Sequence, residues 1–128
     1  MSNLEMLKSA KVIAVLGFST NPSKASNRIA RFLIDAGYTV YLVNPNYAGE
    51  SFLETKIIAK LSQIQEHIDI VDVFIKSESV QNLIDEMISA KPATVWFQPG
   101  ISCPESELKL INAGIRVISN KCIMQELG

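Results

Sequence analysis

The sequence predicts an α/β domain built as a three-layer, doubly wound parallel sheet of five or six strands, with helices on both faces. Short runs rich in β-branched residues alternate with longer amphipathic stretches, which is typical of parallel strands joined by right-handed helical crossovers. The run KVIAVL at Lys11–Leu16 is apolar after its lysine, as expected for a central strand covered on both faces. Because no repeat or linker interrupts the alternation, residues 1–128 are expected to form a single domain.

The first half of the chain predicts two long strands and one crossover helix. The first strand stops at Gly17, and residues 26–36 then place apolar side chains along one helical face, with Gly37 just beyond the helix end. The second strand, Thr39–Val43, ends at Asn44 and Pro45, because proline cannot donate to a ladder. Residues 56–59 predict a short edge strand and residues 61–66 a turn of helix.

The second half continues the alternation. A strand at 68–75 is followed by a helix at 77–90 with Ser77 as its expected N-cap, then by a strand at 94–97, a helix at 104–113 and a last strand at 116–119. Right-handed crossovers place these strands in the order 3-2-1-4-5, with a sixth segment beyond. The switch point then lies between strands one and four, and ligands of such sheets bind beside it, at the carboxyl ends of the strands.

Charge and composition exclude several partners. Twelve Lys and Arg residues against thirteen Asp and Glu residues give a net charge of −1, without a basic stripe interleaved with aromatic residues, so no nucleic-acid partner is expected. The first ten residues include Glu5 and no long apolar run, which predicts neither a signal peptide nor a membrane span and favours a cytoplasmic protein. Cys103, Cys122 and one histidine make no convincing zinc site, so no metal is expected and both cysteines are interpreted as free thiols.

Five segments follow the predicted strand ends and are expected to meet on one rim: residues 17–22, 43–45, 75–77, 98–100 and 120–122. The first of them leads through small and polar residues into the helix at 26–36. The free N–H groups and the positive dipole end of such a helix suit a phosphate, and Lys24 would add a positive charge.

Two common nucleotide motifs are missing from that first loop. It has neither the GxGxxG spacing of dinucleotide-binding folds nor the GxxxxGK[ST] spacing of P-loops, and its only glycine is Gly17. After the second strand, where enzymes that use NAD usually carry an acidic residue for the ribose hydroxyls, this chain has Asn44. Both departures argue against NAD as the ligand.

Five blocks, GFSTNPSKAS, GYTVYLVNP, VDVF, VWFQPGI and NKC, occur in this order between Val12 and Cys122. In sequence and spacing they resemble the small stand-alone CoA-binding proteins, relatives of the CoA-binding domain of succinyl-CoA synthetases. The resemblance implies a Rossmann-like domain that holds coenzyme A or an acyl-CoA, a small-molecule nucleotide ligand, across the carboxyl edge of the sheet. It implies no chemistry common to the family, so no catalytic residue is assigned.

The resemblance also implies which residues bind the cofactor. The implied pyrophosphate and phosphate contacts are Gly17, Phe18, Ser19 and Lys24. The implied border of the adenosine end is Val43, Asn44 and Pro45. The implied opposite wall is Phe74, Ile75, Lys76 and Val80. The residues implied to face the pantetheine arm are Gln98, Pro99 and Gly100.

The chain departs from the usual family pattern where phosphates are gripped. Family members commonly carry Arg-Pro-Ser where this chain has Lys24–Ser26, and two arginines where it has Ile75 and Lys76. Arginine binds phosphate through a bidentate fork and lysine only as a point charge. A looser grip on phosphate, or a different ligand, is therefore expected.

Ordinary structural explanations stand beside these roles. Gly17 also suits a tight turn, Asn44–Pro45 is a good strand terminator, and Lys24 and Lys76 are also typical solvated surface lysines. Val80 belongs to an apolar helical stripe.

Three functions stay open. The first is a non-catalytic CoA-binding module, the second an enzyme or enzyme subunit that acts on CoA thioesters or uses NAD, and the third a family member that has lost its ligand. Asp69 and Asp72 fall inside a predicted strand, so the rim lacks the paired carboxylates of acid/base catalysis. Cys103 stands at a helix start that could lower its pKa, and Cys122 is placed to form a mixed disulfide with CoA. A homodimer or a partner subunit is left open.

Overall fold

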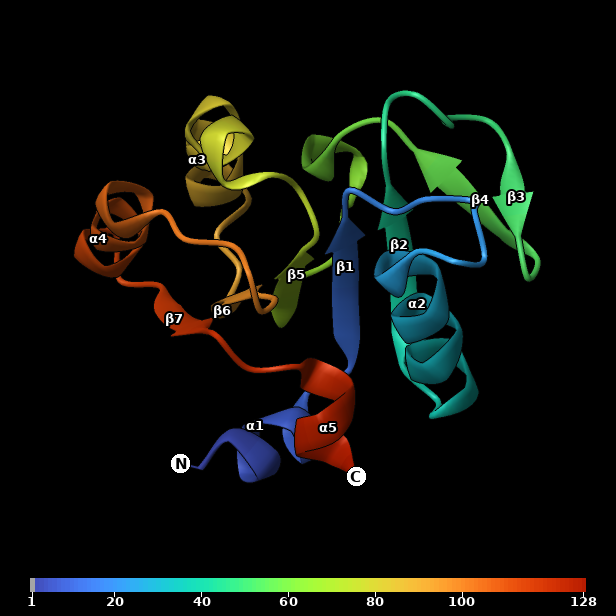
Figure 1. The fold of residues 1–128 in the computed structure, drawn as a ribbon, viewed down its shortest axis with the longest axis horizontal. Coiled ribbons are helices and arrows are strands. Elements are labelled where there is room, and N and C mark those ends of the chain that lie inside the picture. The colour runs from blue at the N-terminus through green and yellow to red at the C-terminus, as the bar shows by residue number, and fades with distance from the viewer. Residues whose placement is uncertain (1) are drawn as a thin grey trace.

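The computed structural model describes residues 2–128 and arranges seven strands in one sheet, in the order β3-β4-β2-β1-β5-β6-β7 (Figure 1). The parallel strands are β1 (Val12–Leu16), β2 (Thr39–Val43), β4 (Thr55–Ile58), β5 (Ile70–Val73), β6 (Thr94–Phe97) and β7 (Arg116–Ser119). This order is the predicted 3-2-1-4-5 with its sixth segment. Among the described strands, the prediction misses only β3 (Ser51–Phe52), a two-residue strand that runs antiparallel to β4 at the sheet edge.

One face of the sheet is covered by α2 (Ala25–Asp35) together with the two terminal helices, α1 (Asn3–Ser9) and α5 (Ile123–Leu127). Apolar side chains of these helices, among them Leu7, Leu33 and Ile123, pack on Ile13 and Trp96 of the sheet. The first and last helices lie side by side in Figure 1, and Asn3 Nδ2 donates a 3.2 Å hydrogen bond to Glu126 Oε1.

The other face is covered by α3 (Ser77–Ala90), α4 (Pro104–Asn112) and the short 3₁₀ turn η1 (Leu61–Gln63). Val80, Ile84 and Met87 repeat at helical spacing along α3 and pack on the buried strands. Because α2 crosses one face after β1 and α3 crosses the other after β5, the winding reverses between these adjacent strands (Figure 1). The predicted three-layer architecture and the predicted switch point are thereby confirmed.

Strand and helix ends differ from the prediction in small ways with local causes. Ser77, the expected N-cap of α3, is its first helical residue, and Lys76 is the N-cap. The Ser77 hydroxyl instead accepts a 2.8 Å hydrogen bond from the Ser102 N–H, so it joins the start of α3 to the loop before α4. Helix α1 was not predicted, although Ser2 and Glu5 form a capping box at its start.

No helix within residues 2–128 has both the length and the apolar character needed to cross a membrane.

Candidate functional site

A cavity of about 600 Å³ opens at the carboxyl edge of the sheet, beside the switch point. It lies where the start of α2, the loops after β5 and β6, and the beginning of α5 come together. Its lining residues are Ala25, Arg28, Ile29, Phe74, Ile75, Lys76, Gln98, Pro99, Gly100, Ile101, Cys122, Met124 and Gln125.

Six of the residues assigned to a ligand from the sequence line this cavity: Phe74, Ile75, Lys76, Gln98, Pro99 and Gly100. They occupy two loops that follow neighbouring parallel strands, β5 and β6, which is why residues more than 20 positions apart share one wall. Lys76 is exposed and Phe74 is half-buried, so the wall offers both a cation and apolar surface.

The loop after β1 lies directly against the loop after β5. Gly17 has a φ of +88°, and a Cβ there would lie 2.8 Å from Ile75 Cγ2 and 3.1 Å from the Phe74 carbonyl carbon and oxygen. Both the backbone conformation and the close approach therefore require glycine at this position. The turn thus brings the first loop next to the wall of the cavity.

Two buried polar side chains at the start of α2 hold this first loop in place. Ser26 Oγ accepts a 3.0 Å hydrogen bond from the Ser19 N–H, and Asn27 Nδ2 donates a 3.0 Å hydrogen bond to the Ser19 carbonyl oxygen. Ser26 and Asn27 are only 4% and 2% exposed, so these bonds are shielded from water. The loop is consequently tied to the helix that follows it.

The end of β2 holds the same loop from the other side. The Val43 carbonyl oxygen accepts from the N–H groups of Gly17 (2.9 Å) and Phe18 (3.3 Å), while Asn44 Nδ2 donates a 2.8 Å hydrogen bond to the Phe18 carbonyl oxygen. The exposed Pro45 follows and ends the strand. Val43, Asn44 and Pro45 thus lie on the same rim as the first loop, but outside the cavity lining.

The side chains of Phe18 and Val80 are wholly buried. Phe18 packs at a ring-centroid distance of 5.0 Å from Phe52, and Val80 lies among the core residues beneath α3. Phe18 therefore contributes only its backbone to the rim. Val80 packs in the core and does not line the cavity. A direct contact between either side chain and a ligand has no support in this arrangement.

The start of α2 borders the cavity at Ala25. Lys24 is the N-cap residue, is exposed, and makes no side-chain hydrogen bond that caps the helix. Arg28, one turn further along, lines the cavity and donates a 2.6 Å hydrogen bond from Nη1 to the Ser23 carbonyl oxygen. Two cations thus stand at a helix end whose dipole favours anions.

Gln98 forms part of the cavity wall and is linked to a buried acid. Its Nε2 donates a hydrogen bond to Asp72 Oδ1, while Asp72 Oδ2 meets no hydrogen-bond partner within residues 2–128. Burial raises the pKa of the Asp72 carboxyl to about 8, although the hydrogen bond from Gln98 acts in the opposite direction. The acid lies behind the wall rather than in the lining.

Sequence reasoning missed six lining residues: Ala25, Arg28, Ile29, Ile101, Met124 and Gln125. A signal for Arg28 was present, since it follows Lys24 by four positions and therefore lies on the same helical face. Met124 and Gln125 belong to α5, a five-residue helix too short to show periodicity.

The two cysteines occupy different places. Cys122 lines the cavity, whereas Cys103 lies in a separate hollow between the starts of α3 and α4. Cys103 stands at a helix start, a position that can lower the pKa of a thiol, but burial, together with the nearby Glu107 carboxylate, raises its pKa to about 11. Both effects disfavour the thiolate.

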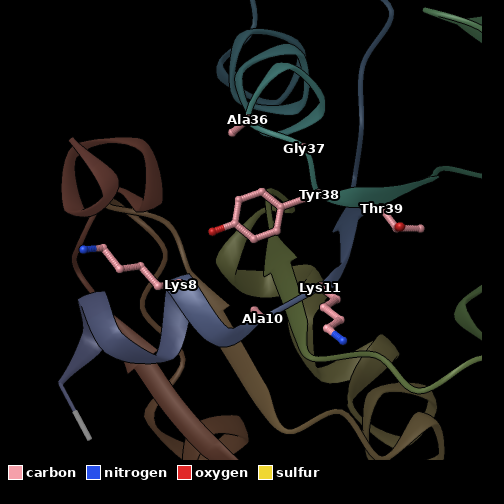
Figure 2. Close-up of a pocket in the computed structure, with 7 residues that line it drawn as sticks. All are labelled: Lys8, Ala10, Lys11, Ala36, Gly37, Tyr38 and Thr39. Atoms are coloured by element: carbon pink, nitrogen blue, oxygen red, sulfur yellow. The ribbon is translucent and has the colours of Figure 1, made fainter.

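A hollow of about 370 Å³ lies at the opposite, amino-terminal edge of the sheet (Figure 2). Tyr38 fills the space between α1 and the end of α2, and its hydroxyl donates a 2.6 Å hydrogen bond to the Leu7 carbonyl oxygen. Figure 2 shows Lys8 and Lys11 pointing away from each other, so their charges do not converge on one point. The hydrogen bond of Tyr38 thus joins α1 to the turn before β2.

No group of three or more His, Cys, Asp and Glu side chains is placed to hold a metal ion within residues 2–128. The single histidine, His67, is exposed, with its Nε2 3.7 Å from Asp69 Oδ1, before the amino end of β5. It lies at the far edge from the cavity.

Comparison with known proteins identifies a family and similar structures. The family model described as "CoA binding domain" matches residues 11–128. The chain is 34% identical over 119 residues to protein YneT of Bacillus subtilis, covering 93% of this chain and 87% of that one. The solved structure of cell-free ID.343 from Thermus thermophilus is similar over 98% of this chain and 96% of its own, with 37% identity and a TM-score of 0.94.

A larger enzyme contains a similar unit. The dinucleotide-forming acetyl-coenzyme A synthetase 1 of Ca. Korarchaeum cryptofilum, solved with phosphate and ADP, matches 94% of this chain with 27% identity and a TM-score of 0.75. The match covers only 28% of that enzyme's length. Since the family model spans nearly the whole chain, the chain belongs to the family of CoA-binding domains.

Proposed function

We propose that the chain binds coenzyme A or an acyl-CoA across the carboxyl edge of its sheet and performs no chemistry on it alone. The observation that carries the proposal is the cavity at the switch point, where an α2 helix start, two strand-end loops and apolar side chains meet in a CoA-binding-domain fold. Ligands of doubly wound sheets bind at this point because the loops diverge there.

The phosphates belong at the start of α2. This helix has eleven residues. The side chain of its N-cap residue, Lys24, accepts no hydrogen bond from the first N–H groups of the helix. Lys24 at the N-cap and Arg28 in the cavity add positive charge next to the dipole end. The tied loop at Gly17–Ser19 then borders the pyrophosphate as a fixed wall, without having to reorder on binding.

The pantetheine arm belongs in the cavity. Ile29, Phe74, Ile101 and Met124 give it apolar walls, and Gln98 supplies a polar group for one of the two amides of the arm. Lys76 stands exposed at the same wall. The adenosine end then lies along the rim at Val43–Pro45.

A non-catalytic role agrees with the side chains available. The titratable groups in the cavity lining are Arg28, Lys76 and Cys122, and the lining contains no histidine or carboxylate to serve as a general base. Hydrolysis or transfer of an acyl group would need groups from a partner chain. NAD is disfavoured because Asn44, the residue after β2, donates its amide to the Phe18 carbonyl rather than offering a carboxylate to a ribose.

The test is a calorimetric titration with CoA, acetyl-CoA, NAD and ATP. We expect CoA and acetyl-CoA to bind and NAD not to bind, with Lys24→Ala and Arg28→Ala each weakening CoA about threefold to tenfold through loss of a phosphate partner. Lys8→Ala is the matched control, since it removes the same charge at the opposite edge of the sheet (Figure 2). Free thiol released from acetyl-CoA should not exceed the buffer rate.

Absence of CoA binding would overturn the proposal in favour of a different ligand. Equal losses in Lys8→Ala and Lys24→Ala would mean that net charge, and not the start of α2, attracts the ligand. Thiol release above the buffer rate would show that the chain is an enzyme.

A further inference from the structure

Asp72 is a buried acid whose carboxyl group is only partly satisfied by hydrogen bonds. It lies in the middle of β5, wholly buried, with Val15 of β1 and Trp96 of β6 as its uncharged strand neighbours. A carboxyl group in such surroundings is costly unless its oxygens are satisfied, and one of them, Oδ2, meets no partner within residues 2–128. A purely structural role would be served better by an apolar residue.

The only side chain that contacts the acid by a hydrogen bond in the described chain is Gln98. Gln98 stands two residues beyond Trp96, the register partner of Asp72, so both side chains emerge on the same face of the sheet. Its Nε2 points inward to Asp72 Oδ1. Its Oε1 accepts no hydrogen bond within residues 2–128. This oxygen is not fully buried, because Asp72 Oδ2 is the one fully buried side-chain nitrogen or oxygen atom without a partner in that range.

The amide of Gln98 can face the acid in two ways, and the proton on the acid decides between them. An ionised carboxylate only accepts, so it holds Nε2 inward and leaves Oε1 toward the cavity. A neutral carboxylic acid can donate its proton to Oε1, which turns the amide over and leaves the two N–H donors toward the cavity.

We propose that Asp72 is a positioning residue that sets which end of the Gln98 amide faces the ligand, and so whether the cavity wall offers an acceptor or donors to the pantetheine arm. This inference rests on the proposed function, because it assumes that the arm occupies the cavity. With Nε2 held by Asp72, the outward Oε1 accepts an amide N–H of the arm. Asp72 acts through Gln98 and does not itself touch the ligand.

Few charges compete with Gln98 for control of this acid. The titratable groups around the cavity are Arg28 from α2, Lys76 from the loop after β5, and Cys122 before α5, and both cations are exposed. Burial raises the pKa of Asp72 to about 8, against the lowering effect of the hydrogen bond from Gln98. The acid therefore changes its charge in a range of pH that is accessible to binding measurements.

The first test follows the Gln98 side-chain amide by ¹H–¹⁵N NMR in the ligand-free protein, from pH 6 to 9. We expect its resonances to shift with pH in the wild type and to stay constant in Asp72→Asn, which cannot ionise but keeps the shape of the side chain. The same pH course in both proteins would overturn the positioning role. Because no ligand is present, this result does not depend on the proposed function.

The second test measures CoA affinity over the same range. We expect the affinity of the wild type to rise about threefold to tenfold with pH relative to Asp72→Asn, the value of one hydrogen bond. In a Gln98→Leu background, Asp72→Asn should have no further effect on the affinity, because the acid then has no amide to orient. Adenosine 3′,5′-bisphosphate, which lacks the pantetheine arm, should show no difference between the wild type and Asp72→Asn.

Parallel pH courses of CoA affinity in the wild type and Asp72→Asn would overturn the inference while leaving CoA binding itself intact. A difference that persists in the Gln98→Leu background would mean that Asp72 acts by another route. Failure of the wild type to bind CoA at any pH would instead overturn the proposed function.

Discussion

Asn44 Nδ2 donates a 2.8 Å hydrogen bond to the carbonyl oxygen of Phe18, so the side chain that ends β2 fixes the loop that follows β1. The Asn44 Oδ1 also accepts a 2.9 Å hydrogen bond from the Asn46 N–H. One half-buried amide thus closes two turns at once. This arrangement explains why an amide, and not the carboxylate typical of NAD-binding folds, stands at this position.

Asn44→Asp should destabilise the protein by about 1–3 kcal/mol, because it keeps the acceptor for Asn46 but sets a carboxylate oxygen against the Phe18 carbonyl oxygen. Urea unfolding at pH 7 measures the change. The side chain of Asn46 is exposed, so Asn46→Ala should change stability by less than about 0.5 kcal/mol. Equal effects of the two substitutions would mean that the bond to Phe18 adds nothing.

Gly17→Ala should cost more stability than the same change at Gly49. Both glycines have a positive φ, +88° and +95°, but a Cβ at 17 meets Ile75 and Phe74, whereas nothing lies within 4 Å of a Cβ at 49. Gly49→Ala therefore reports backbone strain alone, about 1 kcal/mol, and Gly17→Ala adds an overlap worth roughly 1–3 kcal/mol more. Thermal unfolding of both variants checks the difference, and equal melting temperatures would contradict the close packing of the two loops.

How much of this arrangement the sequence could predict depends on which signals are local. The strand order follows from the alternation of strand-like and helix-like segments and from the handedness of the crossovers. The apolar runs at β1 and β5 are long enough to predict strands. The loops after β5 and β6 could be assigned to the site because the sheet's switch point places them there. Helix α5, in contrast, has five residues, and its return over the cavity is a tertiary contact without a local pattern.

The link between Asp72 and Gln98 shows the same limit. The two residues are 26 positions apart and meet only because β5 and β6 are in the register that pairs Asp72 with Trp96. Sequence alternation alone places Asp72 inside a strand, where it looks like a poor candidate for the site. Its relation to the cavity wall follows from the register, which no short segment specifies by itself.

The pH dependence of stability should carry a signature of Asp72. Its pKa rises from 3.8 in an exposed chain to about 8 in the folded protein, so between these values the folded state holds a proton that the unfolded chain has lost. The free energy of unfolding therefore falls as pH rises through this window, by at most about 1.4 kcal/mol per pH unit from this group.

Asp72→Asn removes that contribution and leaves those of all other groups. The stability of the variant relative to the wild type should thus increase from pH 5 to pH 8, as measured by urea unfolding at four pH values. A difference that is constant over this range would show that Asp72 does not retain its proton on folding.

Cys103 should react slowly with alkylating reagents, because its surroundings disfavour the thiolate. Burial and the Glu107 carboxylate raise the Cys103 pKa from 9.0 to about 11, so its thiolate fraction at pH 8 is about 100-fold below that of an unperturbed thiol. Alkylation by iodoacetamide, followed by peptide mass spectrometry, should label Cys103 slowly, and Glu107→Gln should accelerate this labelling by removing the repelling charge.

Bound CoA should protect one of the two cysteines from alkylation and not the other. Cys122 lines the cavity assigned to the pantetheine arm, whereas Cys103 lines a separate hollow between α3 and α4. Saturating CoA should therefore slow alkylation of Cys122 and leave that of Cys103 unchanged. Protection of both cysteines would indicate a general tightening of the fold, and protection of neither would place the arm outside the cavity between α2 and α5.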